Sequence, residues 1–292
     1  MRRCATCSID EGRPIPGATI APARAAVPGI ACRLLAAAVI LLTPAPARAQ
    51  ARLTLDQLLD SNAVAMGGRA RLDRLAAVVT LRTTTSLTSL KLPDFVLIEG
   101  YDSAGAVRYA EGYDGHQAWE QTREDSARRV VTGRAEVALR RVAQWPGNIV
   151  PLYRVGEFGD SLALEGVDSL EGELYYRLRL TLQDGFQRWY FVNATSYLIE
   201  LARDARELHA NDGNTREIET LFTDYRPVDG YWFPFTVIER DLHTGATLSA
   251  RTVLDFFPGV ELPDSLFAAG GHSDPGRLER FRALAASRRD GD

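Results

Sequence analysis

The sequence predicts an α+β protein that is mainly antiparallel β, with its strands curled into an unclosed, half-open β-barrel. Three observations favour this class. Alternating and β-branched runs follow one another along most of the 292-residue chain, turns such as Asp184-Gly185 separate them, and no strand–helix–strand alternation occurs. A parallel α/β fold is therefore excluded. So many consecutive hairpins must curl into a barrel-like sheet, and we expect helices to cover its concave face.

The N-terminal 49 residues have the pattern of a secretory signal peptide preceded by an extension. Nine apolar residues, 34–42, follow Arg33, and Ala47-Arg48-Ala49 then provides a cleavage site before Gln50. Nine helical residues at about 1.5 Å each span less than half of a ~30 Å hydrocarbon core, so we expect no transmembrane segment. The sequence thus predicts an exported, periplasmic protein without a lipid anchor.

Composition and charge exclude several classes of protein. Hydrophobic residues make up 46% of the chain, which supplies a sizeable core and excludes general disorder. Removal of residues 1–49 takes away six arginines and two acidic residues, so the net charge falls from −4 to −8. An acidic chain offers no basic surface to a nucleic acid, and we expect no such partner. All three cysteines lie in residues 1–49, so the mature protein would contain no disulfide.

Helical periodicity predicts three or four helices. Thr54-Leu55-Asp56-Gln57 is a capping box that begins a first amphipathic helix, which Gly67-Gly68 ends. A short second helix is expected over 69–76. A third, over 134–145, places its apolar residues on one side and is ended by Pro146.

Strands account for most of the remaining chain. No linker or composition shift divides them, so residues 50–269 are expected to form one domain, and residues 270–292 a weak helix, with Asp274 as its N-cap, and a charged tail. The expected strands are 79–87, 95–101, 106–111, 116–122, 161–167, 174–183, 187–193, 197–203, 216–225, 232–241 and 247–257.

No motif for catalysis or metal binding is present. The four histidines never occur at metal-ligand spacing, and the chain has neither a Gly-x-Ser-x-Gly elbow nor a glycine-rich phosphate loop. We therefore expect no enzyme activity, no metal and no cofactor. One catalytic alternative stays open, a hydrolase with paired carboxylates on the barrel rim, for which Asp224 and Glu239 are the candidates.

Aromatic side chains occupy consecutive positions in two strands, Trp189-Tyr190-Phe191-Val192 and Tyr231-Trp232-Phe233-Pro234-Phe235. Large apolar groups must therefore point to both faces of the sheet. In one interpretation helices and loops cover both faces and the aromatics are ordinary core. In a second, the concave face stays partly unfilled and accepts an apolar ligand. In a third, exposed aromatics form the interface of a non-catalytic cell-envelope scaffold.

Four short motifs occur in order along the chain, and their order is more specific than any one of them. They are Ala65-Met66-Gly67-Gly68, Tyr113-Asp114-Gly115-His116-Gln117-Ala118-Trp119, Thr223 to Gly230 continuing to Phe233-Pro234, and Pro263-Asp264-Ser265-Leu266-Phe267. Together they resemble the outer-membrane lipoprotein-sorting proteins, relatives of the periplasmic Lol (LolA/LolB-like) carriers. The resemblance implies an unclosed barrel whose apolar cavity, covered by helices, holds acyl chains of a lipoprotein or another lipid.

The hypothesis is therefore a monomeric periplasmic lipid carrier that serves as a lipoprotein chaperone, with transport partners at the inner and outer membranes. Alternation along the strands and the helix suggests which side chains line its cavity. They are Leu81, Leu97 and Trp119 from the early strands, Leu139, Val142 and Trp145 from the helix that forms a lid, and Leu178, Leu180, Phe222 and Phe235 from the later strands.

Overall fold

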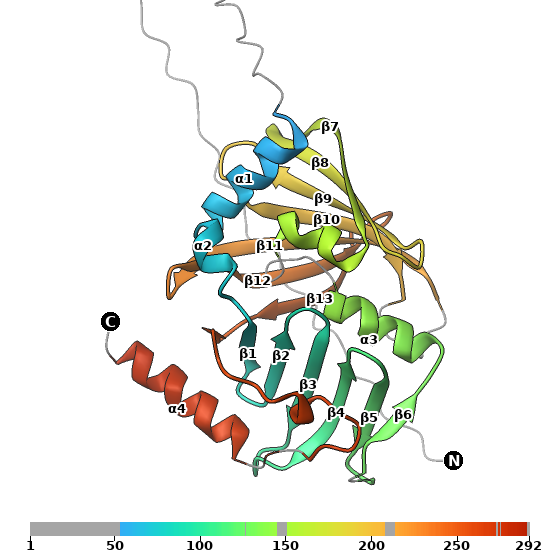
Figure 1. Cartoon of the computed structure of the whole chain (residues 1–292), viewed down its shortest axis with the longest axis vertical. Coiled ribbons are helices and arrows are strands. Elements are labelled where there is room, and N and C mark those ends of the chain that lie inside the picture. Colours follow the sequence, from blue (N-terminus) through green and yellow to red (C-terminus); the bar gives the residue numbers. More distant parts are fainter. Residues whose placement is uncertain are drawn as a thin grey trace, which may run out of the picture. The chain divides into compact units, whose positions relative to one another are not determined.

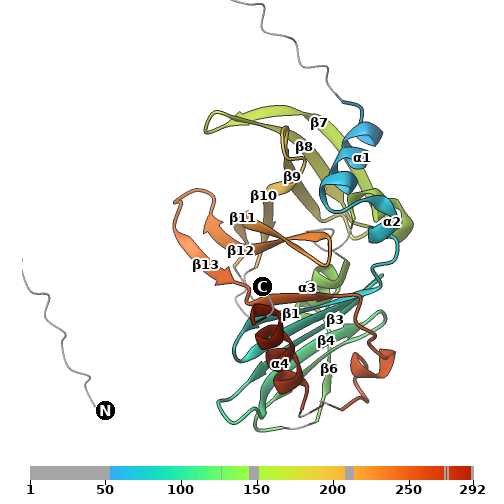
Figure 2. The ribbon, with the colours of Figure 1, turned by 90° about the vertical axis from the view of Figure 1, so that its left-hand side faces the viewer.

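The computed structural model describes residues 53–125, 127–144, 151–207, 214–272, 274 and 276–290. These residues form one compact unit, in which two seven-stranded antiparallel sheets lie next to each other with helices packed against them (Figures 1 and 2). The expected class, a mainly antiparallel and unclosed half-barrel, is confirmed.

The first sheet has the strand order β14-β1-β2-β3-β4-β5-β6. Its strands are β1 (Ala77–Thr83), β2 (Ser86–Lys91), β3 (Phe95–Tyr101), β4 (Val107–Asp114), β5 (Ala118–Thr122), β6 (Arg129–Val131) and β14 (Asp255–Pro258). The expectation of one strand over 79–87 is wrong, because the chain turns at Thr84-Thr85. The Thr83 hydroxyl bonds to the Ser86 hydroxyl at 2.9 Å, so polar side chains make this turn without a glycine.

The second sheet has the order β13-β12-β11-β10-β9-β8-β7. Its strands are β7 (Ser161–Leu170), β8 (Glu173–Thr181), β9 (Gln187–Asn193), β10 (Ile199–Arg206), β11 (Arg216–Val228), β12 (Tyr231–Asp241) and β13 (Thr247–Thr252). The predicted hairpin at Asp184-Gly185 joins β8 to β9. The Asp184 carboxylate accepts from the Phe186 N–H at 3.0 Å, and Gly185 has a φ of +82°, which glycine adopts most readily.

The segment between β13 and β14 joins the two sheets. The Val253 N–H donates to the Phe235 carbonyl of β12 at 2.7 Å, and the Leu254 N–H donates to the Leu81 carbonyl of β1 at 2.8 Å. The chain thus passes from one sheet into the other while its backbone stays hydrogen-bonded. At the far ends, β6 and β7 are not neighbours in the described sheet order, so the curved surface does not close into a barrel.

Six helical segments accompany the sheets in the described residues. Thr54 and Gln57 form the predicted capping box, with the Thr54 N–H donating to Gln57 Oε1 at 2.9 Å. The N-cap expected at Asp274 is two residues early, because the Asp274 carboxylate accepts from the Gly276 N–H in a turn before the helix, and Gly276 is the N-cap. The segments are α1 (Leu55–Ala65), α2 (Arg69–Leu72), α3 (Arg134–Gln144), η1 (Leu152–Phe158), η2 (Asp264–Leu266) and α4 (Arg277–Arg289).

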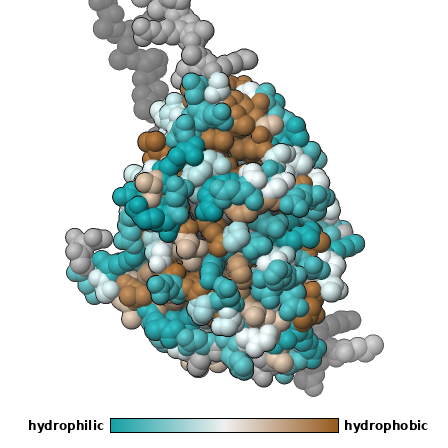
Figure 3. Space-filling model, in the orientation of Figure 1, coloured by the Kyte–Doolittle hydropathy of each residue, from teal (hydrophilic) through white to brown (hydrophobic). Residues whose placement is uncertain are grey.

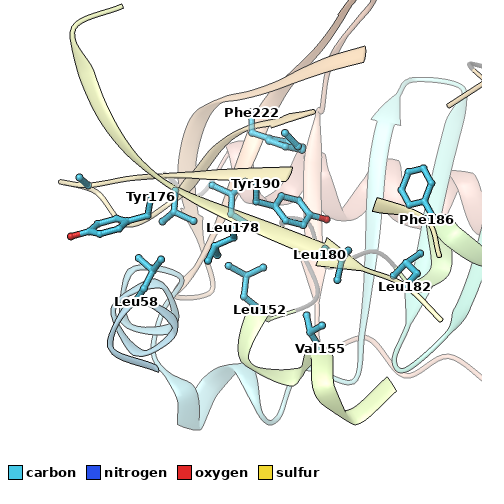
Figure 4. Packing of buried hydrophobic residues seen from close by; sticks show 14 residues of the cluster. Leu58, Leu152, Val155, Tyr176, Leu178, Leu180, Leu182, Phe186, Tyr190 and Phe222 are labelled. Atoms are coloured by element: carbon cyan, nitrogen blue, oxygen red, sulfur yellow. The ribbon is translucent and has the colours of Figure 1, made fainter. Parts of the chain in front are cut away.

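Helix α1 and the 3-10 helix η1 cover part of the concave face of the second sheet. Leu58 of α1 and Leu152 and Val155 of η1 are buried in one cluster with Leu178 and Leu180 of β8, and Figure 4 shows these side chains facing one another. This part of the face is filled by the protein itself and forms its largest core cluster.

Helix α3 packs on the concave face of the first sheet. Its buried residues Leu139 and Ala143 lie against Val96, Tyr113 and Ala118 of β3 to β5. The helix expected over 134–145 is confirmed through residue 144, and Trp145 and Pro146 lie outside the described residues.

The opposite face of the first sheet is covered by α4, which Figure 2 shows running alongside the strands. Leu278 and Phe281 pack against Leu81 and other buried residues of β1, β2 and β14. Arg277 pairs with Glu99 of β3, and both side chains are at most 3% exposed. The segment expected to be a weak helix is therefore part of the core.

The four sequence motifs lie in two contacting pairs. A Cβ on Gly67 would stand only 2.3 Å from the Gly230 carbonyl oxygen, so the end of α1 and the β11–β12 turn approach too closely for any side chain there. In the second pair, the Trp119 indole N–H donates to the Phe267 carbonyl, and both rings are fully buried. The motifs thus hold the helices and the C-terminal segment onto the sheets.

We expect Arg277→Ala to lower the free energy of unfolding by about 3–5 kcal/mol, because it would leave the Glu99 carboxylate buried without a counter-charge. Arg280→Ala is the matched control. Its pair with Asp274 is 58% and 42% exposed, so its loss should cost less than about 1 kcal/mol. Urea unfolding followed by circular dichroism measures both, and equal losses would contradict the core role of α4.

Candidate functional site

A cavity of about 630 Å³ lies between α3 and the two sheets. This volume falls within the roughly 300–1,000 Å³ of small-molecule binding sites. On the face seen in Figure 3, hydrophilic residues predominate, and hydrophobic ones gather near α1 and β7 and in the middle, between the two sheets. The cavity is the part of the concave surface that α1, η1 and α3 leave unfilled.

Strand register explains where the cavity lies on the first sheet. Val78, Leu90, Val96, Tyr113 and Ala118 are paired across neighbouring strands and form an apolar row, most of which α3 covers. Two residues further along each strand, the next row on the same face faces the cavity instead. This second row consists of Thr80, Thr88, Ile98, Glu111 and Glu120.

Apolar side chains from three sources line the rest of the cavity. They come from the inner side of α3, from the first sheet, and from the second sheet with β14. The residues are Ala138, Leu139 and Val142 of α3, Leu90, Ile98 and Val131 of the first sheet, and Phe222, Val237, Val253 and Phe256 on the other side. An extended apolar chain lying here would contact both sheets and the helix.

A network of charges crosses the second sheet along the opposite wall. Arg188 of β9 pairs with Asp204 at 2.8 Å, and Asp204 also pairs with Arg206 of the same strand. Arg206 then reaches Glu239 of β12 at 2.6 Å, and Glu239 pairs with Arg251 of β13 at 3.3 Å. The cavity is therefore amphiphilic, with an apolar part and an arginine-rich part, rather than wholly apolar as the sequence suggested.

Three of the sequence-predicted ligand residues line this cavity: Leu139, Val142 and Phe222. Trp145, the third residue of the expected helical lid, lies outside the described residues. The structure thus brings together a helix and a later strand that the sequence placed in one site.

Leu81, Leu97 and Trp119 lie on the other face of the first sheet, away from the cavity. Leu81 packs under α4, and Leu97 and Trp119 pack with Phe267. Because side chains alternate along a strand, their neighbours are the ones that face the cavity. Hydropathy selects the face under α4, since that face is more apolar than the cavity face.

Leu178, Leu180 and Phe235 lie in core clusters and do not line the cavity. Leu178 and Leu180 are covered by α1 and η1, and Phe235 packs edge-on to Phe256, whose ring does line the cavity. No local sequence pattern reveals which part of a concave face a helix will cover.

The cavity arginines Arg82, Arg188, Arg206 and Arg251 were not anticipated from the sequence. A signal for three of them exists, because Arg82, Arg188 and Arg206 each lie two positions from a buried residue of the same strand. Inward positions could be assigned only after the strand faces were known.

The two candidate hydrolase carboxylates do not share a site. Asp224 pairs with Arg226 at 2.6 Å and does not line the cavity, whereas Glu239 does. Burial would raise the pKa of Glu239, but Arg251 and Arg206 outweigh burial and hold this pKa below its usual value. A carboxyl group held ionised in this way is unsuited to act as a general acid.

Two kinds of feature are absent from the described residues. No group of three or more His, Cys, Asp or Glu side chains that could hold a metal ion occurs among them. No helix in the same part of the chain is both long and apolar enough to cross a membrane.

Neither a protein family profile nor a curated protein sequence matches this chain. Among solved structures, it is similar to a LolA superfamily protein from Nitrosomonas europaea, with 17% identity, 74% of this chain and 98% of that chain covered, and a TM-score of 0.48. A DUF1329 family protein from Desulfovibrio piger gives 15% identity, 73% and 96% coverage, and a TM-score of 0.47. A candidate outer membrane lipoprotein-sorting domain from Vibrio parahaemolyticus has 13% identity and a TM-score of 0.43, and the match covers 65% of this chain and 86% of that chain. At these identities the similarity concerns the backbone.

A Val→Ala substitution should destabilise the protein more in the part of the concave face that helices fill than on the wall of the cavity. Val155→Ala, in the part that η1 fills, should lower the free energy of unfolding by about 2 kcal/mol through lost burial and a residual cavity. Val142→Ala, on the cavity wall, should cost less than about 1 kcal/mol. Urea midpoints compare the two, and an equal loss would mean that Val142 is packed as tightly as the core.

Proposed function

We propose that this protein is a non-catalytic lipid carrier, which binds an acyl chain of a lipid or lipoprotein in the cavity between the two sheets. One observation carries the proposal. The unclosed barrel leaves a cavity of about 630 Å³ in which apolar side chains of α3 and both sheets face one another. The sequence resemblance to periplasmic Lol carriers leads to the same function.

Energetics favour exchangeable binding. Burying apolar surface contributes about 25 cal/mol per Å², so a chain of roughly 300 Å² gains about 7 kcal/mol. The freedom lost on association offsets most of this gain, so the chain alone cannot give tight binding. A carrier needs such affinity, because its ligand must be both taken up and released.

We further propose that the protein works as a monomer in the periplasm and carries its ligand between the inner and outer membranes. The export signal that supports this location is the pattern in residues 1–49, which lies outside the described residues. The corresponding membrane partners would deliver and accept the ligand.

A charge on the cavity wall should abolish chain binding. Val142→Glu places a carboxylate beside the bound chain, so we expect the affinity for a dansyl-labelled fatty acid to fall at least tenfold. Fluorescence titration of the purified chain measures this. Val64→Glu, the same substitution at a position of α1 that is 73% exposed, should leave the affinity unchanged.

Circular dichroism establishes that both variants are folded. A folded Val142→Glu variant with wild-type affinity would contradict the placement of the chain under α3. A wild-type protein that binds no probe, and instead co-purifies with another envelope protein, would favour the scaffold function.

A further inference from the structure

The arginines of the cavity are not equally paired. Among the residues that the structure describes, six arginines line it, and five of these have an acidic partner within 4 Å. Arg134 pairs with Glu207 and Arg141 with Asp184, while Arg188, Arg206 and Arg251 belong to the network through Asp204 and Glu239. The sixth is Arg82 of β1.

Arg82 is a cation without a bonded counter-ion. Within the described ranges, no hydrogen bond or ion pair joins its guanidinium to another residue. Burial lowers the pKa of Arg82, and the positive charge of Arg251 lowers it further. Tyr109, Glu239 and Glu111 act in the opposite direction without restoring the pKa.

Glu239 and Glu111 cannot serve fully as counter-ions for Arg82. Glu239 already binds two arginines, Arg206 and Arg251, so its charge is shared. Glu111 of β4 also lines the cavity, and it already interacts with another residue. A partly buried guanidinium next to a second guanidinium is costly unless an anion compensates it.

The place of Arg82 matters as much as its charge. It follows Thr80 on the same face of β1, and Thr80 is paired with Phe256 of β14, whose ring lines the cavity. Val253 and Val237 also contribute to this wall. An anionic group bound at Arg82 would thus lie next to the apolar part of the same cavity, so a chain attached to it could extend toward α3.

We propose that the ligand is an anionic amphiphile, whose carboxylate or phosphate binds Arg82 beside Arg251 while its chain lies along α3. This inference rests on the proposed function and narrows it to one class of ligand. Guanidinium groups suit this task, because they stay charged and donate paired hydrogen bonds to carboxylates and phosphates.

Two probes that differ only in the anionic group test the assignment. Palmitoyl lysophosphatidate and monopalmitoylglycerol have the same chain and glycerol, and only the first has a phosphate. Titrating both into the full chain should show at least a tenfold preference for lysophosphatidate, since a charge-assisted hydrogen bond is sufficient for that factor.

The Arg82→Gln variant should lose this preference and keep the affinity of the wild-type protein for monopalmitoylglycerol. Arg108→Gln is the matched control, because Arg108 is an exposed arginine of β4 next to Tyr109 and does not line the cavity. It should change neither affinity.

The outcomes separate the two proposals. Equal affinity for both probes would overturn the anionic assignment and leave the carrier function standing, whereas binding of neither probe would overturn the carrier function itself. Inorganic phosphate is a third probe in the same titration. If it bound as tightly as lysophosphatidate, the acyl chain would contribute no affinity and the site would bind a free anion, which would overturn the amphiphile assignment.

Stability without ligand gives an independent readout. If Arg82 is uncompensated in the empty cavity, Arg82→Gln removes a repulsion with Arg251 and should raise the urea midpoint of the ligand-free protein. A lower midpoint would mean that Arg82 holds the fold together, which would contradict the role proposed for it.

Discussion

Two backbone hydrogen bonds, from Val253 to Phe235 and from Leu254 to Leu81, make one curved surface out of two sheets. A single chain segment leaves β13 and enters β14, and its two bonds continue the pairing with β12 on one side of the seam and with β1 on the other. The curvature at the seam brings β1 next to β13. Because of it, Arg82 and Arg251 face the same cavity and the apolar side of α3 faces strands of both sheets.

What fills the concave surface then decides where a ligand can lie. Helix α1 and η1 close one part with a tightly packed cluster, and α3 covers one apolar row of the first sheet. The next row lines the cavity, together with Arg188, Arg206, Glu239 and Arg251 of the charged network. A cavity with a polar and an apolar part suits a molecule with a polar and an apolar part, which is why the charges, and not the volume alone, define the class of ligand.

The sequence predicts the fold better than the site, for a physical reason. Alternation, the Thr54 capping box and the Asp184-Gly185 turn are local signals, and the elements that they predict are present in the structure. Which face of a strand becomes the cavity depends on contacts between distant segments. The sequence predicts Leu81 as a cavity residue because it is hydrophobic. In the structure α4 packs on the side of Leu81, and its neighbour Arg82 faces the cavity. Likewise, Leu178 and Phe222 are both apolar residues on strands of the second sheet, but only Phe222 lines the cavity, and Leu178 is packed with α1 and η1.

Native mass spectrometry of the protein purified gently from a periplasmic fraction, with organic extraction of whatever it holds, shows directly whether the cavity carries an anionic amphiphile. A carrier of this class should show a bound species of lipid mass, whose extract contains acyl chains and a carboxylate or phosphate group. A protein that has only its bare mass, and stays bare after incubation with lipid vesicles and lipoprotein, would not be a lipid carrier.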